Sequence, residues 1–231
     1  MQLKGIIFDL DGTIIDSLPL ISLTFRKVFD VFGIPWGNGE VLKTVGLPLR
    51  EVAATYAPAG RVEEFLATYA KIQKQYQEKL LKAYPGAAET LETLRKEGFR
   101  LALGTSKRRP STMAALQLTG LEKYFDVIVT VDDVERSKPN PDTLFKALKL
   151  LKLKPSAAVY IGDSWYDIMT GKNAGVSTIG VTWGMATREE LDAYNPDFIV
   201  DTWEELLSLL RPPSLAGGSP LSLSDDSGKP A

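Results

Sequence analysis

Short apolar runs that stop at small or acidic residues recur along the chain. The first covers residues 6–8 and leads directly into Asp9-Leu10-Asp11-Gly12-Thr13. Short apolar runs closed by Asp or Gly are typical of buried strands. Later runs of the same character predict further strands at residues 101–103, 125–130, 159–161, 178–181 and 198–200.

Segments with helical periodicity lie between these runs, at residues 85–96, 110–118, 141–150, 164–175 and 202–210. Pro141 suits the first turn of a helix, and Gly98 suits the position just after one. Regular alternation of buried strands and helices is typical of an α/β protein with a doubly wound, parallel, Rossmann-like sheet. We expect this fold for a core made of residues 1–16 and 85–210.

Residues 17–84 have a different pattern. Asp16 and Ser17 suit a helix start, and the apolar stripe that follows extends that helix towards Gly33. Shorter helices are predicted at 37–46 and 48–56, and a long amphipathic helix is predicted from residue 61 to residue 82. We find no strand pattern here, so the segment is predicted to be a small α-helical domain inserted into the core.

The end of the chain, residues 211–231, is rich in Pro, Gly and Ser. Such a composition cannot bury enough apolar surface to offset its conformational entropy, so we expect a disordered tail. The start of the chain has no signal-peptide pattern, and no apolar run approaches the roughly 18 residues of a membrane span. We therefore expect a cytoplasmic protein that does not bind a membrane.

Composition and charge narrow the function. The 231 residues are 44% hydrophobic and carry a net charge of −2, which gives no electrostatic footprint for nucleic acid. The chain has no Cys and no His. These absences exclude a thiol nucleophile, a Ser-His-Asp triad, a phosphohistidine and a His-ligated zinc site. Carboxylate nucleophiles and oxygen-bound cations such as Mg²⁺ remain.

Polar residues stand at the ends of several predicted strands and in the loop between two of them. They are Asp9 and Asp11 after the first strand, Thr105, Lys138 and Asp163. Because the carboxyl ends of parallel strands lie at one edge of a sheet, we expect these side chains to converge. Each also has a structural alternative, since Thr105 and Asp163 suit helix caps and Lys138 suits a solvated loop.

These residues fall in four motifs that together resemble the haloacid dehalogenase superfamily, most of whose members are phosphatases. The resemblance covers residues 3–210, with the motifs in the family's order. The motifs are Asp-Leu-Asp-Gly-Thr at 9–13, a strand followed by Thr-Ser at 105–106, Ser-Lys-Pro-Asn-Pro at 137–141 and Gly-Asp-Ser-Trp-Tyr-Asp at 162–167. The inserted helices resemble the family's small cap, which closes over the core and excludes water.

The resemblance implies catalytic roles for these residues. Asp9 would be the nucleophile and Asp11 the general acid and base, with Mg²⁺ bound by Asp9, Asp163 and the backbone carbonyl of Asp11. Two like unit charges 4 Å apart repel by about 4 kcal/mol at an effective dielectric near 20, or roughly a thousandfold in rate. Magnesium would offset this repulsion between Asp9 and phosphate, and Lys138 would add a second cation at the transferring group.

Supporting roles follow from the same resemblance. Thr105, Ser106 and the backbone at Gly12 are expected to contact the phosphate, although the family often has Asn where Ser106 stands. Asp167 is expected to orient Lys138 or a metal-bound water. Arg50, in the turn 46–50, is a candidate contact for the leaving group, and an exposed arginine at a helix start is an equally good interpretation.

Departures from particular relatives narrow the substrate. Asp11 disfavours dehalogenation, because family dehalogenases lack the second Asp. The absence of His disfavours a sugar phosphomutase. The chain most resembles phosphoglycolate phosphatases, at 45–50, 84–86 and 182–184, and pyrophosphatases of the same subgroup are nearly as similar. We expect a small phosphorylated metabolite as substrate. A catalytically silent module that binds a phosphorylated ligand or a protein is the other class left open, and the oligomeric state is open too.

Overall fold

A sheet of six parallel strands forms the centre of the computed structural model, which describes residues 3–211. The strand order is β5-β4-β1-β6-β7-β8, so β1 lies between β4 and β6. The strands are β1 (Gly5–Phe8), β4 (Arg100–Gly104), β5 (Val127–Val129), β6 (Ala158–Gly162), β7 (Ser177–Val181) and β8 (Phe198–Val200). The α/β fold with a doubly wound parallel sheet, predicted from the alternating pattern, is confirmed.

Helices cover both faces of this sheet, as strand alternation requires. Ile6 and Phe8 face the apolar cluster that contains residues of α4 (Ala87–Lys96), α5 (Arg109–Thr119) and α9 (Trp203–Leu210). Ile7 faces the opposite cluster, which contains residues of α6 (Asp142–Leu151) and α7 (Trp165–Ala174). Shorter elements are α8 (Arg188–Asp192), η2 (Glu122–Tyr124), η3 (Val131–Asp133) and η4 (Pro155–Ala157). The sequence pattern did not predict these shorter elements.

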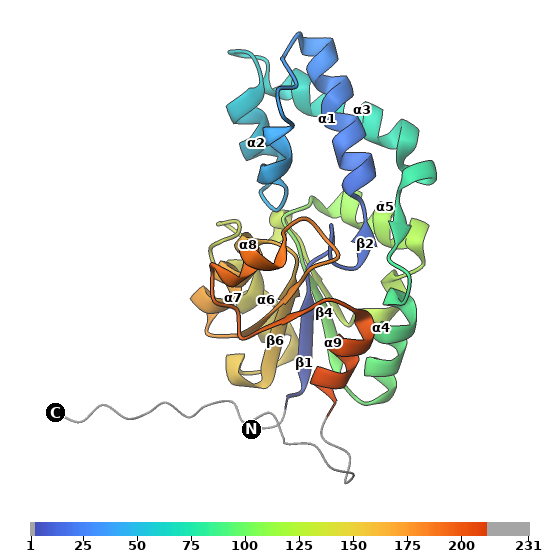
Figure 1. Cartoon of the computed structure of the whole chain (residues 1–231), viewed down its shortest axis with the longest axis vertical. Coiled ribbons are helices and arrows are strands. Elements are labelled where there is room, and N and C mark those ends of the chain that lie inside the picture. The colour runs from blue at the N-terminus through green and yellow to red at the C-terminus, as the bar shows by residue number, and fades with distance from the viewer. Residues whose placement is uncertain (1–2, 212–231) are drawn as a thin grey trace, which may run out of the picture.

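A separate group of helices lies beyond the carboxyl ends of the strands, at the top of Figure 1. We call it the helical unit: α1 (Leu18–Phe32), η1 (Glu40–Thr44), α2 (Leu49–Tyr56) and α3 (Val62–Leu80). It has its own apolar core, in which Phe25, Phe29, Phe65 and Tyr69 are buried. The rings of Phe25 and Tyr69 meet edge to face with centroids 4.9 Å apart, a favoured aromatic geometry.

A two-stranded antiparallel ribbon joins the helical unit to the core. It pairs β2 (Ile15–Asp16) with β3 (Lys82–Ala83). The sequence pattern was wrong here, because it predicted no strand within 17–84 and extended the last helix to Lys82. The helix ends at Leu80, since the residues that follow pair with the chain leaving the core. Asp16 consequently belongs to a strand, and the side chain of Ser17 makes no cap hydrogen bond.

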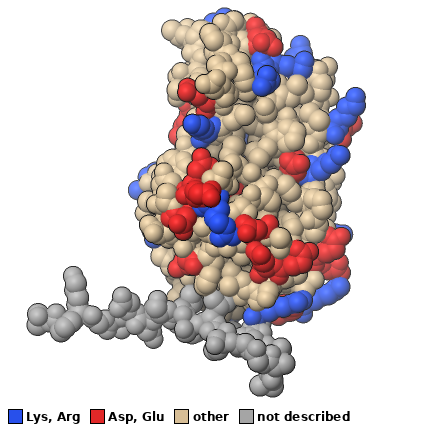
Figure 2. All heavy atoms as spheres, in the orientation of Figure 1, with Lys and Arg blue, Asp and Glu red and all other residues tan. Residues whose placement is uncertain are grey.

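Charged side chains of both signs are interspersed over the face drawn in Figure 2. Within residues 3–211, no helix has the length and apolar character needed to cross a bilayer. The predicted tail begins at residue 211, and from residue 212 onward it lies outside the part of the chain that the structure describes.

Candidate active site

Strand β1 brings Asp9 to the carboxyl edge of the sheet. Its amide donates a hydrogen bond to the Ile161 carbonyl (2.8 Å), which continues the pairing with β6, and its side chain is buried. Gly12 follows with φ +79°, and a Cβ at this position would lie 2.1 Å from an oxygen of Asp163. Only glycine therefore lets the loop after Asp9 pass so close to that carboxylate.

Asp163 reaches the same place from the end of β6. Its two oxygens accept hydrogen bonds from the Thr13 hydroxyl (3.0 Å) and the Met185 amide (2.8 Å). Gly184 leaves the space that this carboxylate occupies. Within residues 3–211 no Lys or Arg pairs with it. Burial, followed by the charges of neighbouring carboxylates, raises the pKa of Asp163 well above its ordinary value.

Lys138 joins two of the acids. Its Nζ lies 2.7 Å from an oxygen of Asp9 and 2.7 Å from an oxygen of Asp167, and its side chain is only 1% exposed. Burial acts to lower the pKa of Lys138, but the charges of Asp167 and Asp9 outweigh burial and raise it. The side chain is therefore a fixed cation in the site.

Asp167 is held in place by its own surroundings. One oxygen lies 2.9 Å from the Tyr160 hydroxyl, which also lies 3.0 Å from the Gly104 carbonyl. The other accepts hydrogen bonds from the amide and hydroxyl of Ser164, in a capping box at the start of α7. These contacts fix the carboxylate towards Lys138, one of the two partners expected for Asp167; the other, a metal-bound water, stays a prediction.

The acids form what we call the carboxylate cluster, Asp9, Asp163 and Asp167, whose oxygens lie within 4.8 Å of one another. With Lys138 between two of them, three carboxylates and one ammonium leave a formal charge of −2 when all are ionised. Burial raises the pKa of Asp9 to about 7, and the charge of Asp167 adds to this effect although Lys138 opposes it. Buried oxygen donors with unbalanced negative charge suit a hard divalent cation such as Mg²⁺.

Asp11 points to a different partner. Its carboxylate oxygens lie 2.8 and 2.9 Å from Nζ of Lys107, and the two side chains are 16% and 13% exposed. Lys107 was not among the predicted site residues, although it directly follows Thr105 and Ser106 at the end of β4. That position was the available signal, because side chains after a parallel strand share the edge with the other strand ends.

Thr105 and Ser106 occupy the loop after β4, as predicted. The Thr105 side chain is buried, and its hydroxyl oxygen accepts a hydrogen bond from the Lys107 amide (3.2 Å). Among the described contacts the Thr105 hydroxyl donates to nothing, so its proton is available to a ligand. The buried hydroxyl of Ser106 has no hydrogen-bond partner within the described part of the chain.

Arg50 lies apart from these residues. Its guanidinium pairs with Glu63 at 2.6 and 3.1 Å, and the two side chains are 63% and 75% exposed. The helical unit contacts the core beside it, because the Ser137 hydroxyl donates to a Glu51 oxygen (2.7 Å). The role predicted for Arg50 at the leaving group stays a prediction.

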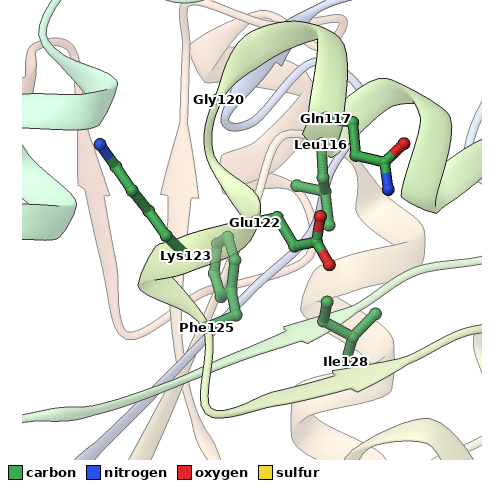
Figure 3. A pocket seen from close by; sticks show the side chains of 7 residues that line it. All are labelled: Leu116, Gln117, Gly120, Glu122, Lys123, Phe125 and Ile128. Carbon is green, nitrogen blue, oxygen red and sulfur yellow. The ribbon is translucent and has the colours of Figure 1, made fainter.

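Tyr160 and Thr13 are further residues that the sequence analysis did not single out for the site. Thr13 stood within the first motif, but nothing in the pattern assigned it to Asp163. Tyr160 is an ordinary apolar-strand residue by pattern, and only the fold places its hydroxyl on Asp167. A shallow pocket lies elsewhere, at the amino end of the edge strand β5 (Figure 3). Its lining residues are Leu116, Gln117, Gly120, Glu122, Lys123, Phe125 and Ile128, none of which is a candidate site residue.

Comparisons with known proteins bear on this arrangement. Residues 6–181 match the family described as haloacid dehalogenase-like hydrolase. The pyrophosphatase PpaX of Halalkalibacterium halodurans is 38% identical over 212 residues, which cover 91% of this chain and 98% of that protein.

Solved structures share the fold. A predicted phosphatase from Clostridium acetobutylicum matches with a TM-score of 0.80 and 29% identity, over 90% of this chain and 98% of that one. A predicted phosphoglycolate phosphatase from Haemophilus somnus matches with a TM-score of 0.83 over 91% and 99%, and its 23% identity supports the fold alone. Because the family match spans residues 6–181 and includes the whole carboxylate cluster, the chain belongs to the haloacid dehalogenase-like hydrolases.

Proposed function

We propose that this hydrolase is a magnesium-dependent phosphatase that forms an aspartyl-phosphate on Asp9 and acts on a small phosphorylated metabolite. The observation that carries the proposal is the carboxylate cluster with Lys138 fixed between Asp9 and Asp167. A buried nucleophilic carboxylate beside a permanent cation suits attack on an anionic phosphorus centre.

Asp9 and Asp163, with the backbone carbonyl of Asp11, would hold the magnesium ion. When bound, the ion would offset the repulsion between Asp9 and the phosphate group. Asp167 is already engaged by Lys138, Tyr160 and Ser164, so its part is to keep the ammonium in place.

In the first step one oxygen of Asp9 attacks phosphorus, and the bond from phosphorus to the leaving oxygen breaks. The other oxygen of Asp9 is held by Lys138 at 2.7 Å, which fixes the direction of attack. Asp11 enters this step protonated, with its ion pair to Lys107 open, and gives that proton to the leaving oxygen. The Thr105 hydroxyl donates a hydrogen bond to an equatorial oxygen of the transferring group.

In the second step water attacks phosphorus and the bond to Asp9 breaks. Asp11 takes a proton from this water, so both carboxyl groups return to their starting forms. The helical unit acts as a cap that excludes other water during the cycle. The hydrogen bond that Ser137 of the core donates to Glu51 of the helical unit supports this role.

Two substrates fit the proposal. Phosphoglycolate is favoured by the turn at 45–50 and the segments at 84–86 and 182–184, which resemble phosphoglycolate phosphatases. Pyrophosphate is favoured by the relatives at 35–38% identity, which are named pyrophosphatase PpaX. Phosphoglycolate and pyrophosphate belong to one substrate class, because each presents a phosphate group joined to a small anionic leaving group.

The test is phosphate release from phosphoglycolate, pyrophosphate, sugar phosphates and nucleotides, with magnesium and with a chelator. We expect turnover that requires the metal and falls by at least about 10⁴-fold in Asp9→Asn. The control is Asp30→Asn, the same substitution on an exposed helix position. Substantial turnover in Asp9→Asn would contradict the mechanism. A metal-replete wild type inert towards the whole panel would favour the binding module instead.

A further inference from the structure

Lys107 stands on the side of the site where the leaving group must depart. Its ammonium contacts both oxygens of Asp11, at 2.8 and 2.9 Å. In the proposed mechanism Asp11 must reach the leaving oxygen to protonate it. Because Lys107 is paired with Asp11, the group attached to that oxygen lies close to the Lys107 ammonium as well.

This cation differs from the other one in the site. Lys138 is shared between Asp9 and Asp167 and is 1% exposed. The side chain of Lys107 is 13% exposed, and within residues 3–211 it has one carboxylate partner, Asp11. Its backbone is anchored on both sides, because its amide donates to Thr105 and its carbonyl accepts from Val131 (3.3 Å). The ammonium can therefore turn towards a ligand while its loop stays in place.

The helical unit contributes a polar group near the same acid. Tyr69 of α3 is 5% exposed. Burial, followed by the charge of Asp11, raises the pKa of its hydroxyl well above the ordinary value. The phenol stays neutral and can donate a hydrogen bond, so the surroundings of Asp11 include a cation from the core and a neutral donor from the helical unit.

From this arrangement we infer that Lys107 determines specificity for leaving groups that carry their own negative charge close to the leaving oxygen. The inference rests on the proposed function and deepens it. The shared chemistry is an anion attached next to the scissile bond, either the second phosphate of pyrophosphate or the carboxylate of phosphoglycolate. Without Lys107 such an anion would face the carboxylate of Asp11 with no cation paired to that acid, because Lys138 is held by Asp9 and Asp167.

Arg50 is a weaker candidate for this task. It is already paired with Glu63, both side chains are exposed, and within residues 3–211 no hydrogen bond joins it to Asp11. Lys107 instead touches the acid that works on the leaving oxygen. Proximity to the reacting atoms therefore assigns the anionic leaving group to Lys107.

The test compares substrates that differ in this one charge. Phosphoglycolate and ethyl phosphate share a two-carbon leaving alcohol, and only the first carries a carboxylate. Pyrophosphate is the second anionic arm. We expect Lys107→Met to lower kcat/KM for phosphoglycolate relative to ethyl phosphate by on the order of 10- to 100-fold, the range of a lost charged hydrogen bond. Lys107→Arg keeps the charge and should retain most of the preference. Of phosphoglycolate and pyrophosphate, the substrate whose kcat/KM falls more carries the anion for which Lys107 is specific.

An equal loss on all three substrates in Lys107→Met would overturn the inference and make Lys107 a positioning residue for Asp11. That result would leave the proposed function intact, whereas an inactive wild type would remove the function itself. Lys149→Met, the same change at an exposed position of α6, controls for loss of a surface charge. If Lys107→Met does not fold, Lys107→Gln against Lys107→Arg gives the same comparison.

Discussion

The two sides of the active site are built differently. On the first side, the Lys138 side chain is 1% exposed and its partners Asp9 and Asp167 are 7% and 2% exposed. Each member of the carboxylate cluster is held by contacts to the core. The leaving-group side, made of Asp11 and Lys107, is more open, at 16% and 13% exposure for its ion pair. One side therefore has a single arrangement, and the other has room to adjust.

This difference separates chemistry from specificity. Every substrate of a phosphatase presents the same transferring group, so a rigid cluster held by hydrogen bonds suits it. Leaving groups differ in size and charge, and a partly exposed lysine beside a separate helical unit can meet them. The rigid side also concentrates buried negative charge, which costs stability in the absence of a cation.

The largest effect is expected where the rigid side loses its internal cation. Lys138→Met leaves Asp9 and Asp167 buried without their countercharge. We expect the free energy of unfolding to fall by about 3–5 kcal/mol and kcat to fall by at least 10²- to 10³-fold. Denaturant unfolding and phosphate release measure the two quantities.

The exposed Lys149→Met is the matched control for this substitution and should change neither quantity much. A stable, active Lys138→Met would contradict the view that the cluster depends on its internal cation. A variant that is stable but inactive would limit the role of Lys138 to the chemistry.

An intermediate effect is expected from pH and magnesium acting on the same cluster. Burial raises the pKa of Asp9 from 3.8 to about 7 and that of Asp163 well above its ordinary value. Protonation therefore stabilises the metal-free fold at low pH, and this contribution is lost as pH rises from about 4 through about 7. Magnesium binds the ionised carboxylates, so the increase in Tm that it causes should grow between about pH 5 and pH 8.

Thermal unfolding with and without magnesium, at constant ionic strength, measures this increase. In Asp163→Asn the increase should nearly vanish at every pH, and the metal-free variant should be at least as stable as the wild type above pH 7, because a buried charge has been removed. A magnesium effect that is independent of pH would mean that the metal binds away from the cluster.

The rigid side was also the part that sequence could predict. Asp9 and Asp163 follow short apolar strands, and parallel strands bring their carboxyl ends together whatever the distance along the chain. The partners that position these acids were not predictable in this way. Tyr160 points to Asp167 only because of the register between β6 and its neighbours, and Gly184 leaves room for Asp163 only once the loop after β7 is folded.

The ribbon at the entrance to the helical unit shows the same limit. Ile15–Asp16 and Lys82–Ala83 are too short for strand periodicity to be visible. Their pairing is a tertiary contact between segments more than 60 residues apart, and it overrides the helical pattern that continues to Lys82. Lys107 was missed for another reason, since a lysine after a strand is usually a solvated side chain.

The smallest effect is expected at Arg50, and it sharpens the comparison most directly. Its pair with Glu63 is exposed on both sides, and exposed ion pairs contribute little to stability. We expect Arg50→Ala to change kcat/KM for phosphoglycolate and ethyl phosphate by less than about threefold, far below the effect of Lys107→Met. Glu63→Gln, which removes the partner and keeps the arginine, is the matched control.

If Arg50→Ala instead lowered the preference for phosphoglycolate as strongly as Lys107→Met, the helical unit would have to move far enough to bring this arginine from Glu63 to the substrate. Specificity would then reside in that movement, and the open side of the site described here would be only its resting state.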